Sequence, residues 1–174
     1  MIKKLILKDA FGVWILLTAC LFGGVILNEI RPNPLPLVYA PPETRIRQAV
    51  ERMDYFPKSP ISLEGDVSLE EMRQISSTHA ALILDARPEI FYRLGHIPSA
   101  LSLSRDNFEK QYHAVEFILQ AHRDKVLVLY CAGSDCRDSQ MVGDALIRLG
   151  YLHVRLFRGG WSDWESSNLP EEQE

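Results

Sequence analysis

The segment Val126-Leu-Val-Leu-Tyr130 is followed directly by Cys131-Ala-Gly-Ser-Asp-Cys-Arg-Asp-Ser139, and this stretch decides the fold. Five apolar, mostly branched residues are typical of a strand buried on both faces in the middle of a parallel sheet. From residue 139 to 149 the apolar residues fall on one helical stripe, and Asp138 or Ser139 can cap the start of that helix. The pattern therefore predicts a strand, a tight loop and a helix.

Cys131 lies in the loop where this strand ends and the helix begins. Backbone N–H groups converge at such a place, and the helix dipole favours negative charge there. Because its thiolate would gain these donors, a cysteine in this position ionises more easily than a free one. The local pattern therefore predicts that Cys131 is a nucleophile.

Composition limits the classes of function. The chain has 174 residues, of which 47% are hydrophobic, and a net charge of −4; this fits one globular domain plus an additional segment. The negative charge and the lack of a basic stripe argue against nucleic acid as a partner. Three cysteines are too few for a disulfide scaffold, and the five histidines form no ligand-spaced cluster with them. We expect neither a metal nor another cofactor.

The N-terminal segment has the character of a membrane-spanning helix. Nineteen residues from Ala10 to Asn28 carry no charge, and as a helix they extend roughly 28 Å, about the thickness of the hydrocarbon core. Lysines precede this run, whereas only Arg31 follows it closely. The positive-inside rule then keeps residues 1–9 in the cytoplasm, with a single transmembrane helix over residues 10–30 and the remainder on the exported, periplasmic or extracytoplasmic side.

Two alternatives to an anchor remain. A cleaved signal peptide is the first, but Val38-Tyr39-Ala40 is a poor cleavage site and lies well past the apolar run, which favours an uncleaved anchor. A buried soluble helix is the second, and the lack of a polar stripe argues against it.

Residues 31–60 are expected to connect this helix to a domain. Five prolines fall between Arg31 and Pro42, which predicts an extended polyproline II spacer. From Glu43 to Phe56 apolar residues repeat at helical spacing. A short amphipathic helix is therefore expected there, either near the membrane or packed on the domain.

Residues 61–170 alternate short apolar runs with helical patterns, and residues 171–174 form a tail. This alternation predicts an α/β domain with a mostly parallel sheet and helices on both faces. Active sites of such sheets lie beyond the C-terminal ends of the strands. Asp85, Cys131 and Arg158 each follow or end a predicted strand, so we expect them at that edge.

Four motifs stand in the order and spacing of a rhodanese domain. They are Asp85-Ala-Arg87, Gly95-His-Ile-Pro-Ser-Ala100, Tyr130-Cys131 with its loop, and Arg158-Gly-Gly-Trp-Ser-Asp-Trp164. The stretch that resembles the family runs from about Ile61 to Pro170. Rhodanese domains are α/β, and the family's cysteine takes a sulfane sulfur from a donor and passes it to a thiophilic acceptor. The resemblance therefore implies a membrane-anchored sulfurtransferase.

Carried over by position, the resemblance makes Cys131 the nucleophile that forms a persulfide. The loop whose backbone N–H groups would hold the thiolate or persulfide consists of Ala132, Gly133, Ser134, Asp135, Cys136 and Arg137. Asp85 and Arg87 match an acidic–basic pair that orients the structure, and Arg158 is expected to support the site. The implied partners are a small sulfur donor, such as thiosulfate or a persulfide, and a thiol acceptor.

The length of the loop is a departure from single-domain rhodaneses. Five residues instead of the usual four separate Cys131 from Arg137, which resembles the rhodanese-fold phosphatases and arsenate reductases. Arg137 offers a fork of donors for an oxyanion, unless it is only a solvated surface arginine. Tyr130 replaces the histidine usual in those enzymes. The carboxylates of Asp135 and Asp138 would also repel a phosphate dianion.

Cys136 is the second departure. It could form a disulfide with Cys131 and resolve a persulfide or sulfenate there, and an oxidising exported side would favour that bond. The other interpretation is that Cys136 only fills space in the loop. Geometry decides between them, because a disulfide needs the two Cα atoms within roughly 7 Å. The sequence thus leaves three classes of function: a sulfurtransferase, an oxyanion enzyme, and a thiol-redox or interaction module.

Overall fold

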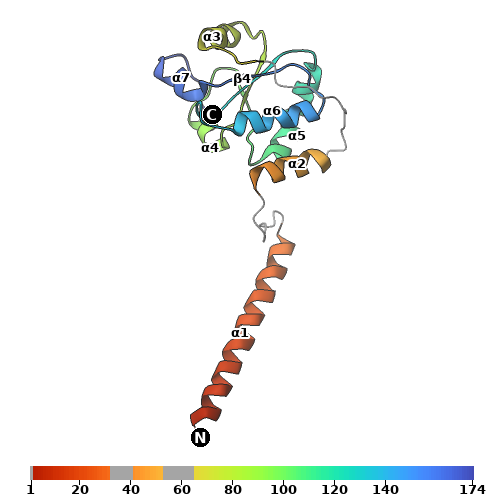
Figure 1. The fold of residues 1–174 in the computed structure, drawn as a ribbon, viewed down its shortest axis with the longest axis vertical. Coiled ribbons are helices and arrows are strands. Elements are labelled where there is room, and N and C mark those ends of the chain that lie inside the picture. The colour runs from red at the N-terminus through yellow and green to blue at the C-terminus, as the bar shows by residue number, and fades with distance from the viewer. Residues whose placement is uncertain (1, 32–40, 53–64) are drawn as a thin grey trace. The chain divides into compact units, whose positions relative to one another are not determined.

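The computed structural model describes residues 2–31, 41–52 and 65–174. The chain divides into two compact units, Met1–Ala40 and Pro41–Glu174. Along the chain the elements are α1 (Ile2–Ile30), α2 (Pro42–Arg52), α3 (Leu69–Thr78), β1 (Leu82–Asp85), α4 (Glu89–Leu94), β2 (Leu101–Ser102), α5 (Phe108–Ala121), β3 (Leu127–Tyr130), α6 (Asp138–Arg148), β4 (Val154–Phe157) and α7 (Gly160–Ser166), coloured in this order in Figure 1.

The first unit contains the single helix α1. Its segment Gly12–Ile30 is 19 residues long with a mean hydropathy of 1.9, which is long and apolar enough to cross a membrane. The predicted N-terminal apolar helix is confirmed, and both an anchor and a signal sequence have this character. The predicted polyproline spacer falls mostly on residues 32–40, outside the described residues.

The second unit is built on a four-stranded parallel sheet in the order β2-β1-β3-β4. All four residues of the central strand β3 are buried, as its apolar run predicts. Side chains alternate between the two faces of the sheet along β3. Leu127 and Leu129 therefore lie in the core on one face, and Val128 and Tyr130 lie in the core on the other. The predicted α/β fold is confirmed.

Helices cover both faces of this sheet. Side chains from α2, α5 and α6 form the core on one face, for example Phe108 and Leu146, and side chains from α3, α4 and α7 form the core on the other, for example Met72 and Trp164. Each of these four is at most 2% exposed. Burying one such side chain contributes roughly 1.5–3 kcal/mol, so the two cores fix the strand ends firmly.

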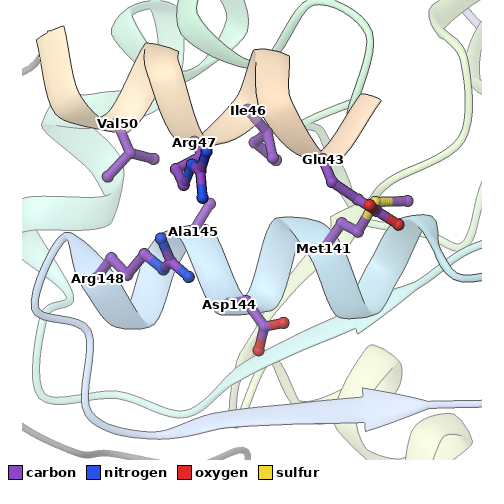
Figure 2. Close-up of a pocket in the computed structure, with 8 residues that line it drawn as sticks. All are labelled: Glu43, Ile46, Arg47, Val50, Met141, Asp144, Ala145 and Arg148. Carbon is purple, nitrogen blue, oxygen red and sulfur yellow. The ribbon is translucent and has the colours of Figure 1, made fainter. Parts of the chain in front are cut away.

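Helix α2 packs on the second unit. Ile46, Ala49 and Val50 form its buried stripe and belong to the core shared with α5 and α6. Of the two expected placements for the amphipathic helix, packing on the domain therefore holds, and residues 53–56 lie outside the described residues. Figure 2 shows a groove of about 180 Å³ between α2 and α6. Its lining residues include no cysteine, serine or histidine.

The N-terminus of α3 is capped by a local side chain, whereas the N-terminus of α6 is not. At α3, Ser68 and Glu71 form a reciprocal capping box. At α6 the expected cap is wrong: the helix begins at Asp138, and Arg137 at the N-cap position makes no side-chain cap. The carboxylate of Asp138 instead accepts a hydrogen bond of 2.7 Å from Arg105, which lies 33 positions earlier. This long-range ion pair outcompetes local capping.

Acid is expected to weaken the attachment of α3 to β4. A hydrogen bond from Arg155 lowers the pKa of Glu71 below its ordinary value of 4.5, although burial opposes this shift. Because the folded pKa is the lower one, the stabilisation is present above pH 4.5 and is lost as the pH falls through the folded pKa. Water screens this half-exposed pair, so we expect at most about 1 kcal/mol.

Denaturant unfolding of the full chain and Glu71→Gln measures this effect. The two proteins should differ at about pH 7 and become more alike as the pH falls below 4.5 through the lowered pKa of Glu71. A difference that stays constant with pH would show that the carboxylate charge contributes nothing.

Candidate active site

The ends of three neighbouring strands place the predicted site residues at one edge of the sheet. Asp85 ends β1, Tyr130 ends β3 and Phe157 ends β4, and these three residues are register partners. Cys131 and Arg158 follow directly. The expected meeting of Asp85, Cys131 and Arg158 at the C-terminal strand ends is therefore what the structure shows.

The loop 131–137 is held in place by the start of α7. The backbone N–H of Trp161 donates to the carbonyl of Cys131 at 2.8 Å, and that of Ser162 donates to the carbonyl of Ala132 at 2.9 Å. Within the loop, the N–H of Cys136 donates to the carbonyl of Gly133 at 3.0 Å. The nucleophile loop and the segment after β4 thus form one backbone-bonded unit.

Gly160 makes this close contact possible. It has a φ of +62°, and a Cβ atom built on it would lie 2.4 Å from the carbonyl oxygen of Cys131 and 2.9 Å from the nitrogen of Gly133. Any other residue would both strain the backbone and push the loop away. Gly160 of the fourth motif therefore allows the close packing of α7 on the cysteine loop.

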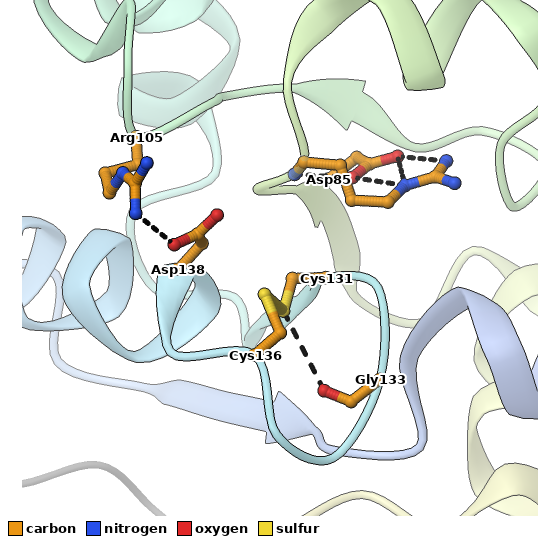
Figure 3. The surroundings of a disulfide bond; sticks show 7 residues. Asp85, Arg105, Cys131, Gly133, Cys136 and Asp138 are labelled. Carbon is orange, nitrogen blue, oxygen red and sulfur yellow. Dashed lines mark hydrogen bonds and ion pairs between the residues drawn. A yellow bond between two sulfur atoms is a disulfide. The ribbon is translucent and has the colours of Figure 1, made fainter.

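Cys131 and Cys136 are joined by a disulfide, with their Cα atoms 6.3 Å apart (Figure 3). This geometry favours the redox interpretation of Cys136 over simple space filling. Cys131 is only 1% exposed, whereas Cys136 is half-buried. In the oxidised loop the sulfur of Cys131 is therefore covered, and Cys136 is the more accessible partner.

A buried ion pair lies beside the loop. Arg87 donates to both carboxylate oxygens of Asp85, at 2.7 to 3.1 Å, and to the carbonyl of Gly95 at 2.6 Å. The hydroxyl of Tyr130 donates to Asp85 at 2.7 Å. The guanidinium of Arg87 also lies 4.5 Å from the ring centroid of Trp161. The backbone N–H of Trp161 donates to Cys131, so this ring lies between the ion pair and the cysteine loop.

Tyr130 is fixed as a neutral phenol. Burial, reinforced by the charge of Asp85, raises the pKa of Tyr130 far above its ordinary value. Its hydroxyl also accepts a hydrogen bond from the N–H of Ile97 at 3.2 Å. With both partners engaged, Tyr130 positions Asp85 and the following strand end rather than transferring a proton.

Replacing Asp85 with asparagine is expected to cost roughly 3–5 kcal/mol of unfolding free energy, because the guanidinium of Arg87 would stay buried without its counter-charge. The double variant Asp85→Leu with Arg87→Met removes both charges and should recover much of that loss. Denaturant unfolding of the full chain in detergent measures both. Equal losses in the single and double variants would contradict the ion-pair explanation.

The charged residues around the loop divide into paired and unpaired groups. Asp138 is paired with Arg105 (Figure 3), and burial raises the pKa of Asp138 although Arg105 opposes the shift. Arg158 is paired with Asp66 at 2.8 Å and does not contact the loop. Asp135 and Arg137 are exposed, and neither side chain makes a hydrogen bond or ion pair within the described residues.

A hollow of about 380 Å³ opens beside the loop, lined by residues 132–136 together with Gly159, Ser162 and Asp163. Ser162 and Asp163 belong to the fourth motif but are not predicted as lining residues, because their position beside the hollow depends on where the start of α7 packs. Within the described residues, no group of three His, Cys, Asp or Glu side chains is placed to hold a metal ion.

The sequence family agrees with this geometry. A profile of the rhodanese-like domain matches residues 68–167, which is more than half of the chain and includes every element from α3 to α7. The chain belongs to the rhodanese-like domain family. Its fold is therefore that of the sulfurtransferase superfamily.

Solved structures share this rhodanese-like fold at low sequence identity. A crystal structure of a Bacillus halodurans protein has a TM-score of 0.54 at 18% identity, and the match covers 76% of this chain and 87% of that one. The solution structure of a rhodanese-like domain from an Anabaena sp. protein has a TM-score of 0.53 at 20% identity, covering 64% and 81%. At these identities the likeness shows the fold.

Curated sequence relatives are much longer than this rhodanese-like chain. The tRNA uridine(34) hydroxylase of Escherichia coli is 40% identical over 53 residues, which are 30% of this chain. The match spans 15% of the length of that relative.

Proposed function

We propose that this chain is a sulfurtransferase in which Cys131 carries a sulfane sulfur as a persulfide. One observation carries this proposal: Cys131 follows the central strand in a loop that the start of α7 clamps through two backbone hydrogen bonds. A cysteine in that loop is fixed in position and can be surrounded by N–H donors, which favours its thiolate. Membership of the rhodanese-like family points to the same sulfur chemistry.

The reaction needs two displacements. First, the Cys131 thiolate attacks the sulfane sulfur of the donor, whose S–S bond breaks and releases sulfite or a thiolate. Then an acceptor thiolate attacks the outer sulfur of the Cys131 persulfide and releases the Cys131 thiolate, ready for another cycle. No general base is required when both attacking groups react as thiolates.

The disulfide favours thiol-redox chemistry as a second candidate. Cys131 and Cys136 form a dithiol–disulfide pair that could accept or donate two electrons without any sulfur transfer.

An oxyanion enzyme has less support. Pairing of Asp138 with Arg105 removes one repulsive charge, but Asp135 stays unpaired and Tyr130 is committed to Asp85. The net charge of −4 likewise gives no support for a tRNA substrate.

The proposed location is on the exported side of a membrane. The lysines before α1 favour a cytoplasmic N-terminus, and α1 then serves as an uncleaved single-pass anchor. Such a compartment is oxidising and matches a loop disulfide.

Turnover assays test the proposed function. The reduced full chain in a nonionic detergent is supplied with thiosulfate or a small persulfide and with an excess of a thiol acceptor. The acceptor persulfide then reacts with a second acceptor thiol to give a disulfide and sulfide, and this sulfide is followed. Sulfide production should require Cys131 and should continue in Cys136→Ser. Reversible disulfide exchange without sulfide production would favour the redox candidate instead.

A further inference from the structure

The hollow beside the cysteine loop is acidic. Asp135 and Asp163 are its two charged lining residues, and both are exposed. Neither carboxylate has a hydrogen bond or ion pair within the described part of the chain. The other lining side chains are small or polar. A small molecule that enters this hollow therefore meets two uncompensated negative charges.

Asp163 is directed back across the glycine turn. A Cβ atom built on Gly159 would lie 2.2 Å from a carboxylate oxygen of Asp163, so this side chain lies directly against the turn that lines the hollow. Asp135 lines the same hollow from within the cysteine loop. Cys136, which is bonded to Cys131, lines it too. The two carboxylates thus share the hollow with Cys136, the more accessible member of the sulfur pair.

Basic residues close to the loop do not cancel this charge. Arg105 and Arg158 are already paired with Asp138 and Asp66. Arg137 is unpaired and exposed, but it is not one of the residues that line the hollow. Two lining carboxylates against one neighbouring guanidinium leave an excess of negative charge.

From this imbalance we infer that the site selects sulfur donors by charge and takes an amine-bearing persulfide in preference to the thiosulfate dianion. This inference rests on the proposed sulfurtransferase function and narrows its donor class. The Cys131 thiolate attacks the outer sulfur of the persulfide, the donor S–S bond breaks, and the aminothiol leaves. An ammonium group on the donor is attracted by Asp135 and Asp163, whereas thiosulfate is repelled by both.

Three sulfur donors that differ stepwise in net charge test the inference. They are thiosulfate, a dianion; 2-hydroxyethyl persulfide, an anion; and 2-aminoethyl persulfide, whose ammonium cancels its persulfide charge. The reduced full chain in nonionic detergent is mixed with each donor, and the rate at which it gains one sulfur atom is measured by mass. Because the donors differ in intrinsic reactivity, each variant is compared with wild type for the same donor.

Asp163→Asn and Asp135→Asn should each raise the rate with thiosulfate roughly three- to tenfold, and should lower the rate with the aminoethyl donor. The hydroxyethyl donor should respond less than thiosulfate. Both effects should shrink in about 1 M salt, where the screening length is only about 3 Å. Asp124→Asn is the matched control, because Asp124 is exposed in the turn before β3, at the opposite edge of the sheet.

The outcomes are distinguishable. If neither variant changes the rates with thiosulfate and with the aminoethyl donor in opposite directions relative to wild type, or if Asp124→Asn changes them equally, the inference on charge is overturned while sulfur transfer stands. If no donor adds sulfur to the folded, reduced wild type, the proposed function fails and the inference fails with it. Opposite responses to thiosulfate and to the aminoethyl donor support the inference.

Discussion

Cys131→Ser is expected to abolish sulfur transfer, with a rate loss of roughly 10³-fold or more. A serine hydroxyl in the loop cannot form the persulfide that links the two displacements, and no other cysteine occupies this place in the sheet. Sulfide release from a donor and a thiol acceptor, followed at steady state with the full chain, measures the loss. Residual turnover within tenfold of wild type would contradict the assigned nucleophile.

A matched set of variants separates chemistry from folding in this experiment. Cys131 is 1% exposed, so a polar hydroxyl there could disturb the loop; Cys131→Ala serves as a second inactive variant. Cys136→Ser introduces the same chemical change five positions later and should keep most of the activity. Cys20, the free cysteine in α1, is replaced by serine throughout to exclude sulfur carried there.

Oxidation of the loop is expected to switch off sulfur transfer almost completely. In the disulfide form the sulfur of Cys131 is bonded to Cys136 and has no thiolate to attack a donor. A dithiol reductant should restore the full rate: its thiolate attacks the more accessible sulfur of Cys136, the disulfide breaks, and Cys131 leaves as a thiolate. The second thiol of the reductant then releases Cys136.

Reductant dependence measures this second effect. Wild type freed of reductant after oxidation should be inactive and lighter by two hydrogens, and Cys136→Ser should be active without any dithiol. A fully oxidised wild type that turns over at the reduced rate would contradict the blocking role of the disulfide. Equal reductant dependence in wild type and Cys136→Ser would contradict it as well.

Local sequence patterns predict those helices and strands whose formation depends mainly on neighbouring residues. The buried strand β3 follows from its branched apolar run, because only a strand covered on both faces suits such residues. Helix α4, Glu89–Leu94, also has local boundaries, because Pro88 precedes it and Gly95 follows it. The capping box at α3 is likewise local, with its two members three positions apart.

Features that depend on distant contacts are not predictable in this way. Asp138 looks like a helix cap in the sequence, yet it pairs with Arg105 because the strand order brings β2 and α6 to the same edge. Arg158 pairs with Asp66, which lies 92 positions earlier in the sequence. Asp163 lines the hollow only because α7 packs against the cysteine loop. Each of these placements depends on contacts between segments that are far apart in the sequence, and the spacing of neighbouring residues does not predict such contacts.

The most direct test of the central claim is a mass measurement on the reduced full chain carrying Cys20→Ser. The protein is incubated with thiosulfate and, separately, with 2-hydroxyethyl persulfide, and the added mass is then located by peptide mapping. A persulfide on Cys131 predicts a gain of one sulfur atom on the peptide that contains Cys131, which an added thiol removes. No gain from either donor in a folded, reduced protein, or sulfur found only on Cys136, would contradict the account.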